Sequence, residues 1–134
     1  MKQTAWADLP NAKHIDRILA DFKKNPDRWY ATRNAASDAA RDDAWDAARD
    51  AARYAARNAA RDDAWYAART ATRNATRNAA WYAAWYAILV LIACDDCAYL
   101  LDEKPEHVQM LALLGNQAAL LLYPACVAMQ KEKT

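Results

Sequence analysis

Three aspartates in the C-terminal half of the chain are the best candidates for acid-base chemistry. Asp95 and Asp96 interrupt a long apolar run, and Asp102 follows it. A carboxylate in an apolar helix is costly to bury unless a cation or a hydrogen-bond donor pairs with it. We therefore expect arginines from the alanine-rich part of the chain to neutralise these side chains. The alternative is a general acid or a metal ligand.

Cysteines offer a second kind of chemistry. Cys94 and Cys97 have the spacing of a redox or metal-binding pair, and Cys126 makes the number odd. An odd number does not suggest a disulfide framework. A zinc site usually needs four suitable ligands, and the only histidines are His14 and His107. We expect three reduced, buried, structural cysteines and no metal or cofactor, with metal or redox chemistry as the alternative.

Motifs that would identify an enzyme are missing from the sequence. There is no glycine-rich phosphate loop, no nucleophile with an evident histidine base and no Glu-x-x-His pair. The sequence therefore predicts a protein that is not an enzyme. A small enzyme that uses Asp95 and Asp96 is the alternative.

Arginines recur every fourth residue in two series, Arg49, Arg53, Arg57, Arg61 and Arg69, Arg73, Arg77. Like charges at this spacing weakly destabilise a helix, so an anionic group should compensate. Local aspartates such as Asp46 and Asp50 supply part of the compensation, which would make this a solvated face with its own ion pairs. The sharper interpretation is that the arginines, with Tyr54 and Tyr66, face an acidic protein partner. Arg and Tyr concentrate binding energy at interfaces.

Nucleic acid is a third partner to consider, because arginines interleaved with aromatic residues can track phosphates and stack on bases. The aspartates between the arginines argue against a continuous basic groove. The formal net charge of +1 also creates no global field that would draw the chain to nucleic acid or to a membrane. We therefore do not expect either partner.

Five tryptophans occupy the same position of a four-residue repeat: Trp29, Trp45, Trp65, Trp81 and Trp85. Alanine lets neighbouring helices approach closely, and we expect the large rings to cover the seams between them. The densest aromatic cluster is the pair Trp81-Tyr82 with Trp85-Tyr86, our candidate for a pocket or an exposed binding site. The predicted partner-binding residues are Arg53, Tyr54, Arg57, Tyr66, Arg73, Arg77, Trp81, Tyr82, Trp85 and Tyr86.

These residues belong to a repeat of the form [Trp or Arg]-x-Ala-Ala that runs from Trp29 to Ala87. Its composition predicts helix. Four residues turn a helix through about 400°, so equivalent side chains drift by about 40° per unit and one straight helix is not expected. The hexapeptides 40–45 and 60–65 are identical, and an aspartate replaces alanine in each. Aspartate favours helix starts, so we predict breaks near 41–43 and 61–63.

Helices are also expected outside the repeat. Asn11 should cap a short helix that ends near Lys24, whose apolar face is formed by Ile15, Ile18, Leu19 and Phe22, with His14 at its boundary as a satisfied histidine. Residues 87–101 are apolar on all sides and predict the central helix of the core. Pro105 should begin a helix that ends near Gly115, and Asn116 should start a last helix over 117–131 that Pro124 kinks or splits.

Together these elements predict an all-α fold: a single domain over 1–134 built as an array or bundle of about seven helices. It consists of an N-terminal arm and helix (1–27), the alanine-rich repeat region (28–87) and apolar C-terminal helices (88–134). The start of the chain has no apolar run typical of a signal peptide, and the longest apolar stretch is cut by two aspartates. We expect a soluble protein of the cytoplasm.

A resemblance adds to this prediction. The alanine tract is followed by Asp95-Asp-Cys-Ala-Tyr-Leu-Leu-Asp102, by Leu113-Leu-Gly115 and by Leu122-Tyr-Pro-Ala125. Together these segments resemble the alanine-rich helical proteins catalogued as immunity proteins of bacteria and their phages, over most of the chain from about Arg28 onward. The resemblance implies a small helical protein that inhibits a toxin or another effector by binding it. The alternative is a phage counter-defence protein, anti-CRISPR-like, that binds a host defence complex.

Overall fold

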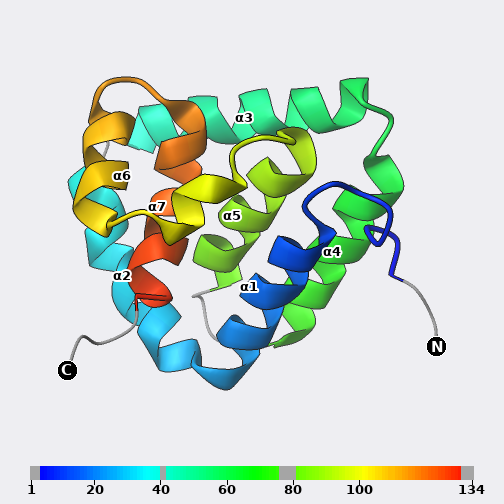
Figure 1. Cartoon of the computed structure of the whole chain (residues 1–134), viewed down its shortest axis with the longest axis horizontal. Coiled ribbons are helices and arrows are strands. Elements are labelled where there is room, and N and C mark those ends of the chain that lie inside the picture. The colour runs from blue at the N-terminus through cyan, green and yellow to red at the C-terminus, as the bar shows by residue number, and fades with distance from the viewer. Residues whose placement is uncertain (1–3, 40–41, 76–80, 131–134) are drawn as a thin grey trace.

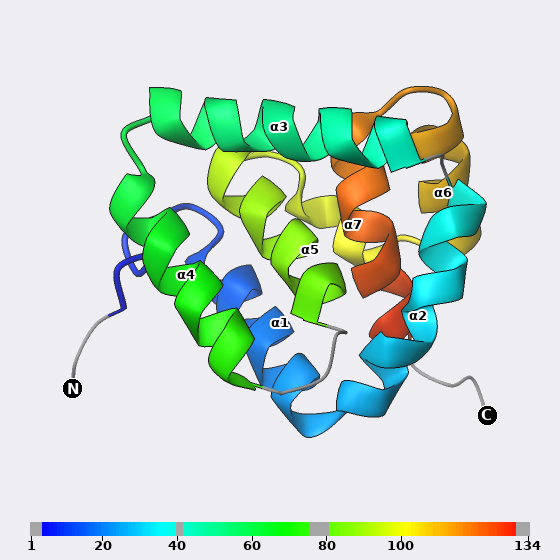
Figure 2. The same cartoon turned by 180° about the vertical axis from the view of Figure 1, so that it is seen from behind.

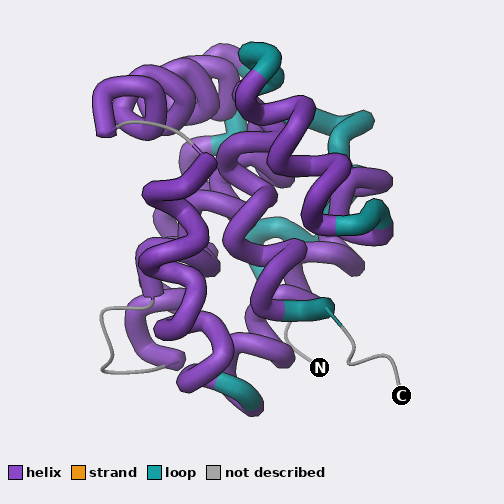
Figure 3. The backbone as a smooth tube through the Cα atoms, turned by 90° about the vertical axis from the view of Figure 1, so that its left-hand side faces the viewer, coloured by secondary structure: helices purple, strands orange, loops and turns teal. Residues whose placement is uncertain are grey.

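The computed structural model describes residues 4–39, 42–75 and 81–130 of the 134-residue chain, without the side chains of 33–39 and 42. In this part of the chain seven α-helices and one 3-10 helix follow one another, no strand is present, and the tube in Figure 3 is helical along most of its course. The all-α prediction and the expected number of helices are confirmed. The helices are α1 (Ala12–Lys24), α2 (Pro26–Ala39), α3 (Asp42–Asn58), α4 (Asp62–Ala75), α5 (Trp81–Ala93), η1 (Ala98–Asp102), α6 (Pro105–Leu113) and α7 (Gln117–Ala128).

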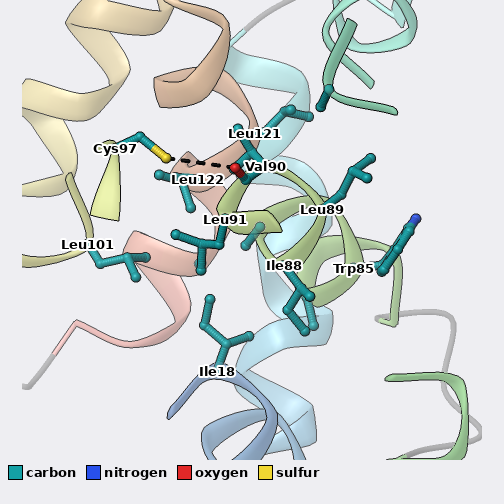
Figure 4. Packing of buried hydrophobic residues seen from close by; sticks show 14 of the residues in the cluster. Ile18, Trp85, Ile88, Leu89, Val90, Leu91, Cys97, Leu101, Leu121 and Leu122 are labelled. Carbon is teal, nitrogen blue, oxygen red and sulfur yellow. Dashed lines mark hydrogen bonds between the residues drawn. The ribbon is translucent and has the colours of Figure 1, made fainter. Parts of the chain in front are cut away.

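The apolar helix α5 lies in the middle of the molecule, and the other helices surround it (Figures 1 and 2). It contacts α1, α2, α3, α4 and α7. Every residue from Ala87 to Ile92 is buried, and Figure 4 shows Ile88, Leu89, Val90 and Leu91 packed among side chains of the surrounding helices. The expected central position of the apolar segment is confirmed.

The bounds predicted for this central helix are wrong. The sequence predicted helix over 87–101, whereas α5 runs from Trp81 to Ala93 and is followed by a turn and by the 3-10 helix η1. Burial of Asp95 and Asp96 in an apolar helix would be costly. Because the helix ends before them, both carboxylates lie on the surface.

The repeat region contains separate helices. The break predicted near 61–63 is confirmed, whereas residues 40 and 41, on which the break predicted near 41–43 partly falls, lie outside the described residues. α2 ends at Ala39 and α3 begins at Asp42, while α3 ends at Asn58 and α4 begins at Asp62. The second break is a Schellman motif, in which the N–H of Arg61 donates to the carbonyl of Ala56 at 3.0 Å and the N–H of Ala60 donates to that of Arg57 at 2.9 Å. Ala60 has φ of 59°, a left-handed conformation that costs an L-residue roughly 1–2 kcal/mol. The helix stop therefore forms without a glycine, and Asp63 lies within the first turn of α4.

The end of α6 near Gly115 and the start of α7 after Asn116 are as predicted. Gly115 has φ of +100°, and the N–H of Asn116 donates to the carbonyl of Leu111 at 3.0 Å in a second Schellman motif. The Asn116 side chain then accepts from the N–H of Ala119 at 3.0 Å and caps α7. Pro124 does not split α7, which is continuous to Ala128, three residues short of the predicted end. Nearly all of α7 is buried, and this packing holds the helix together across the proline.

The first helix has the predicted bounds and face. Ile15, Ile18 and Phe22 are fully buried and Leu19 is half-buried against them. Asn11, however, makes no side-chain hydrogen bond to α1. Its amide instead donates to the carbonyls of Leu91 at 3.0 Å and Cys94 at 2.8 Å, at the C-terminal end of α5. Asn11 therefore caps the end of the central helix and joins the N-terminal segment to it.

Among the described residues, no helix has both the length and the apolar character needed to cross a membrane.

The bonds of Asn11 give a stability prediction. Asn11→Ala removes both donors and leaves the buried carbonyl of Leu91 without this partner, so it should lower the free energy of unfolding by about 1–3 kcal/mol. Chemical denaturation followed by circular dichroism measures the change. Asn74→Ala, at an exposed position of α4, is the matched control and should cost nothing. Equal midpoints for the two variants would contradict the capping role.

Candidate functional site

The three aspartates singled out by the sequence lie on the surface. Asp95 is paired with Arg61 of the repeat region, whose Nη1 is 2.6 Å from the Asp95 Oδ1, as expected. Asp102 is paired with Arg17 of α1 at 3.4 Å, so its partner does not come from the repeat. Asp96 accepts a hydrogen bond from the Cys94 thiol at 3.1 Å. The expectation that these carboxylates lie in an apolar helix is wrong, because α5 ends before them.

The ion pair of Arg61 and Asp95 joins two parts of the fold. Arg61 also donates to the carbonyl of Ile92 at 2.7 Å, so one side chain joins the corner between α3 and α4 to the end of α5. The hydrogen bond from Arg61 holds the pKa of Asp95 below its ordinary value of 3.8. Arg61 and Asn11 together satisfy three carbonyls at the end of the central helix.

The cysteines are free thiols, and two of the three are buried. Burial raises the pKa of Cys97 far above its usual range and raises that of Cys126 to about 12. A thiol that stays protonated is a poor nucleophile and a poor metal ligand. In the described part of the chain, no three His, Cys, Asp or Glu side chains are grouped so that they could hold a metal ion. The expected reduced state and the burial of Cys97 and Cys126 are confirmed, and Cys94 is half-buried.

The two histidines lie apart from each other on α1 and α6. His14 is half-buried at the edge of the apolar face, where the sequence placed it, but its buried Nδ1 has no hydrogen-bond partner among the described residues. His107 lies 3.3 Å from the Glu103 carboxylate on the surface. Neither histidine belongs to a described metal site.

A pocket of about 340 Å³ opens where α3, α4 and α5 meet. We call it the arginine–tryptophan pocket, because guanidinium groups and aromatic rings form most of its wall. It is lined by Arg49 and Arg53 from α3, Trp65 and Arg69 from α4, and Trp81, Tyr82, Trp85, Tyr86 and Leu89 from α5.

Aromatic contacts build the wall of this pocket. Trp65 of α4 meets Trp85 of α5 edge to face, with ring centroids 5.6 Å apart. Trp81 and Tyr82 are stacked with centroids 4.0 Å apart, and Tyr82 lies 6.2 Å from Tyr86. The rings therefore extend from the seam between α4 and α5 to the exposed side chain of Tyr82, which retains 52% of its accessible surface.

The arginines of the pocket lie against these rings. The guanidinium groups of Arg53 and Arg69 lie over the Trp65 ring, at 5.2 and 5.7 Å from its centroid. Neither makes an ion pair with a described residue. Arg49 differs, because it pairs with Asp46 at 3.4 Å and Asp50 at 3.3 Å. The pocket thus has two guanidinium groups whose charge no described carboxylate neutralises.

The structure brings half of the predicted partner-binding residues together. Those that line the pocket are Arg53, Trp81, Tyr82, Trp85 and Tyr86. Tyr54 and Arg57 are exposed on α3. Arg73 of α4 is exposed with its guanidinium 5.5 Å from the Trp81 ring centroid, and Tyr66 lies in a shallow depression on another face of α4. Arg77 lies outside the described residues.

The tryptophans were expected either to pack in the core and the helix seams or to form an exposed binding site. Trp29 and Trp45 are buried, and Trp65 is half-buried between α4 and α5, in agreement with the predicted core and seam positions. Trp85 is only 4% exposed, so it lines the pocket from within and is not an exposed binding residue.

The list of predicted partner-binding residues does not include four residues that line the pocket, Arg49, Trp65, Arg69 and Leu89. A signal was present, because Trp65 and Arg69 are four residues apart and share one face of a helix. That spacing alone does not indicate which neighbouring helix meets the face.

Comparisons with protein-family models, curated proteins and solved structures return no match to this chain.

The tie between Arg61 and Asp95 predicts a dependence of stability on pH. Asp95→Asn should lower the free energy of unfolding by about 1 kcal/mol at neutral pH, since the side chain is half exposed. The Asp95 pKa is lower in the folded state, so the stabilisation is complete above the ordinary value of 3.8 and is lost as the pH falls through the folded-state pKa.

Urea denaturation across this pH range measures the difference between wild type and variant, which should vanish in acid. Asp8→Asn is the control, since Asp8 is exposed and makes no ion pair with a described residue. A difference that persists in acid would argue against the ion pair as its cause.

The thiols should react in two classes. A chromogenic disulfide reagent should modify the half-buried Cys94 of the folded protein first, and should reach Cys97 and Cys126 only after unfolding. Cys94→Ser should abolish the fast phase, whereas Cys126→Ser should leave it intact. Three equal rates in the native protein would refute this ordering.

Proposed function

We propose that this protein is a non-enzymatic inhibitor that occupies the working surface of an acidic protein partner. The observation that carries the proposal is the presence on α3 and α4 of arginines without a described ion pair, next to exposed tyrosines. Arg53 and Arg73 lie over tryptophan rings, and Tyr54 and Tyr66 are 68% and 56% exposed. Such residues are enriched in the energetic centres of protein interfaces.

The positions of these arginines favour an interface over a solvated face. A solvated face with its own ion pairs would neutralise its arginines with local aspartates, as Arg49 is neutralised by Asp46 and Asp50. Arg57 reaches Asp62 only at 3.9 Å, and Arg53 and Arg73 have no such partner in the described part of the chain. A guanidinium held over an aromatic ring also loses less side-chain freedom when it binds a carboxylate.

The resemblance to immunity proteins supports the inhibitor role and suggests two kinds of target. An immunity protein would neutralise a toxin or a similar effector, whereas a counter-defence protein of a phage would bind a host defence complex. The rival enzyme that uses Asp95 and Asp96 is less well supported, because Asp95 is tied to Arg61 and both carboxylates lie on the surface.

Charge reversal tests the proposed surface. Replacement of Arg53, Arg57 and Arg73 together by Glu should weaken partner binding by at least about 100-fold, because like charges opposite an acidic surface cost several kcal/mol. The helical fold should persist, since the two ring contacts that are lost contribute only about 0.5–1 kcal/mol each. Affinity capture from a host lysate, followed by titration of the captured partner, measures the loss.

The matched control replaces Lys13, Lys23 and Lys24 of α1 by Glu, which changes the net charge equally at exposed positions elsewhere. This variant should bind as the wild type does. An inhibitor should also abolish the partner's activity in proportion to the amount added, with saturation at equal molar amounts. Recovery of the same partner by both variants would mean that the arginines of α3 and α4 are not the interface.

A further inference from the structure

We propose that the arginine–tryptophan pocket binds a small anion that carries a planar aromatic ring, of the nucleoside monophosphate class. This inference goes beyond the inhibitor function and does not rest on it. The pocket volume of about 340 Å³ lies within the range of small-molecule sites. An inorganic phosphate or a single carboxylate would fill only part of that space.

Two guanidinium groups supply the anion-binding part. Arg53 comes from α3 and Arg69 from α4, and both guanidinium groups line the pocket and lie over the Trp65 ring. A guanidinium that lies over a ring still presents N–H donors at its edge, and these match the paired oxygens of a phosphate. No described carboxylate competes for either group.

A stack of planar groups supplies the part that receives the ring. Arg73 lies 5.5 Å from the Trp81 ring centroid, and Trp81 is stacked on Tyr82 at 4.0 Å. Tyr82 lines the pocket and is 52% exposed, so its ring offers a surface on which a planar base can stack. The buried side chains of Trp85 and Leu89 provide the apolar wall behind it.

The presence of both guanidinium groups and an exposed aromatic ring favours a nucleotide over an acidic peptide or a nucleic acid strand. An acidic peptide would use the guanidinium groups but not the exposed ring of Tyr82. A nucleic acid strand needs a continuous basic groove for successive phosphates, whereas Asp46 and Asp50 flank Arg49 at the edge of this pocket. A single nucleotide uses both the cationic and the aromatic part, and it places only one phosphate group there.

Isothermal titration of the full chain with AMP, GMP, CMP and UMP tests the proposal. We expect saturable binding of at least one nucleotide, weakened by added salt, with much weaker binding of inorganic phosphate and of the matching nucleoside. Arg69→Gln should weaken binding about tenfold, and Arg69→Lys should recover part of it. Tyr82→Ala should weaken binding by about tenfold or more, the loss typical of a base stacked on an aromatic side chain.

Tyr99→Ala is the matched control, because Tyr99 is similarly exposed but lies in η1, outside the lining of the pocket. It should bind as the wild type does, and circular dichroism should show that all variants are folded. The proposal is overturned if no nucleotide binds at low salt, if the folded Arg69→Gln variant binds equally well, or if only a hexaglutamate peptide or an oligonucleotide binds. The interface experiment replaces neither Arg69 nor Tyr82. The two proposals can therefore fail separately.

Discussion

The burial of α5 is the constraint on which the rest of the structure depends. This helix has an apolar surface on every side, so it must be enclosed by α1, α2, α3, α4 and α7. Enclosure removes water from its C-terminal carbonyls, which then need donors from the protein. Asn11 and Arg61 supply them from two distant parts of the chain. The same bonds join two other segments, the N-terminal segment and the corner between α3 and α4, to the end of α5.

The alanine repeat is what allows so many helices to surround one. Ala48, Ala52 and Ala56 of α3 and Ala64 and Ala68 of α4 are buried, and their small side chains permit close approach to the apolar core. Alanine provides little volume, however, and the space at the edges of the seams has to be filled by other side chains. Tryptophans of the repeat, buried or half-buried, fill it, and where α3, α4 and α5 converge the aromatic rings line a pocket. The pocket is therefore a consequence of the way in which an alanine-rich helix array is packed.

Much of the fold could be predicted because its signals are local. The left-handed stop at Gly115, the cap at Asn116 and the apolar face of α1 depend on residues a few positions apart. The end of α5 could not be located in this way, because it is decided by the solvation of Asp95 and by its distant partner Arg61. The pocket was predicted only in part for the same reason. Periodicity indicates which residues share a helix face, but not which three faces meet.

One side chain can serve both the fold and a ligand in this pocket, and the geometry shows why. A guanidinium stacks through its flat face and donates hydrogen bonds through its edge, so the contact of Arg69 with Trp65 leaves its donors available. The ring contact contributes modestly to stability, while the edge can bind an anion with a strength that depends on its orientation. The ring supplies that orientation before the anion arrives. Loss of the arginine should therefore weaken anion binding more than it destabilises the fold, whereas loss of the tryptophan should damage both.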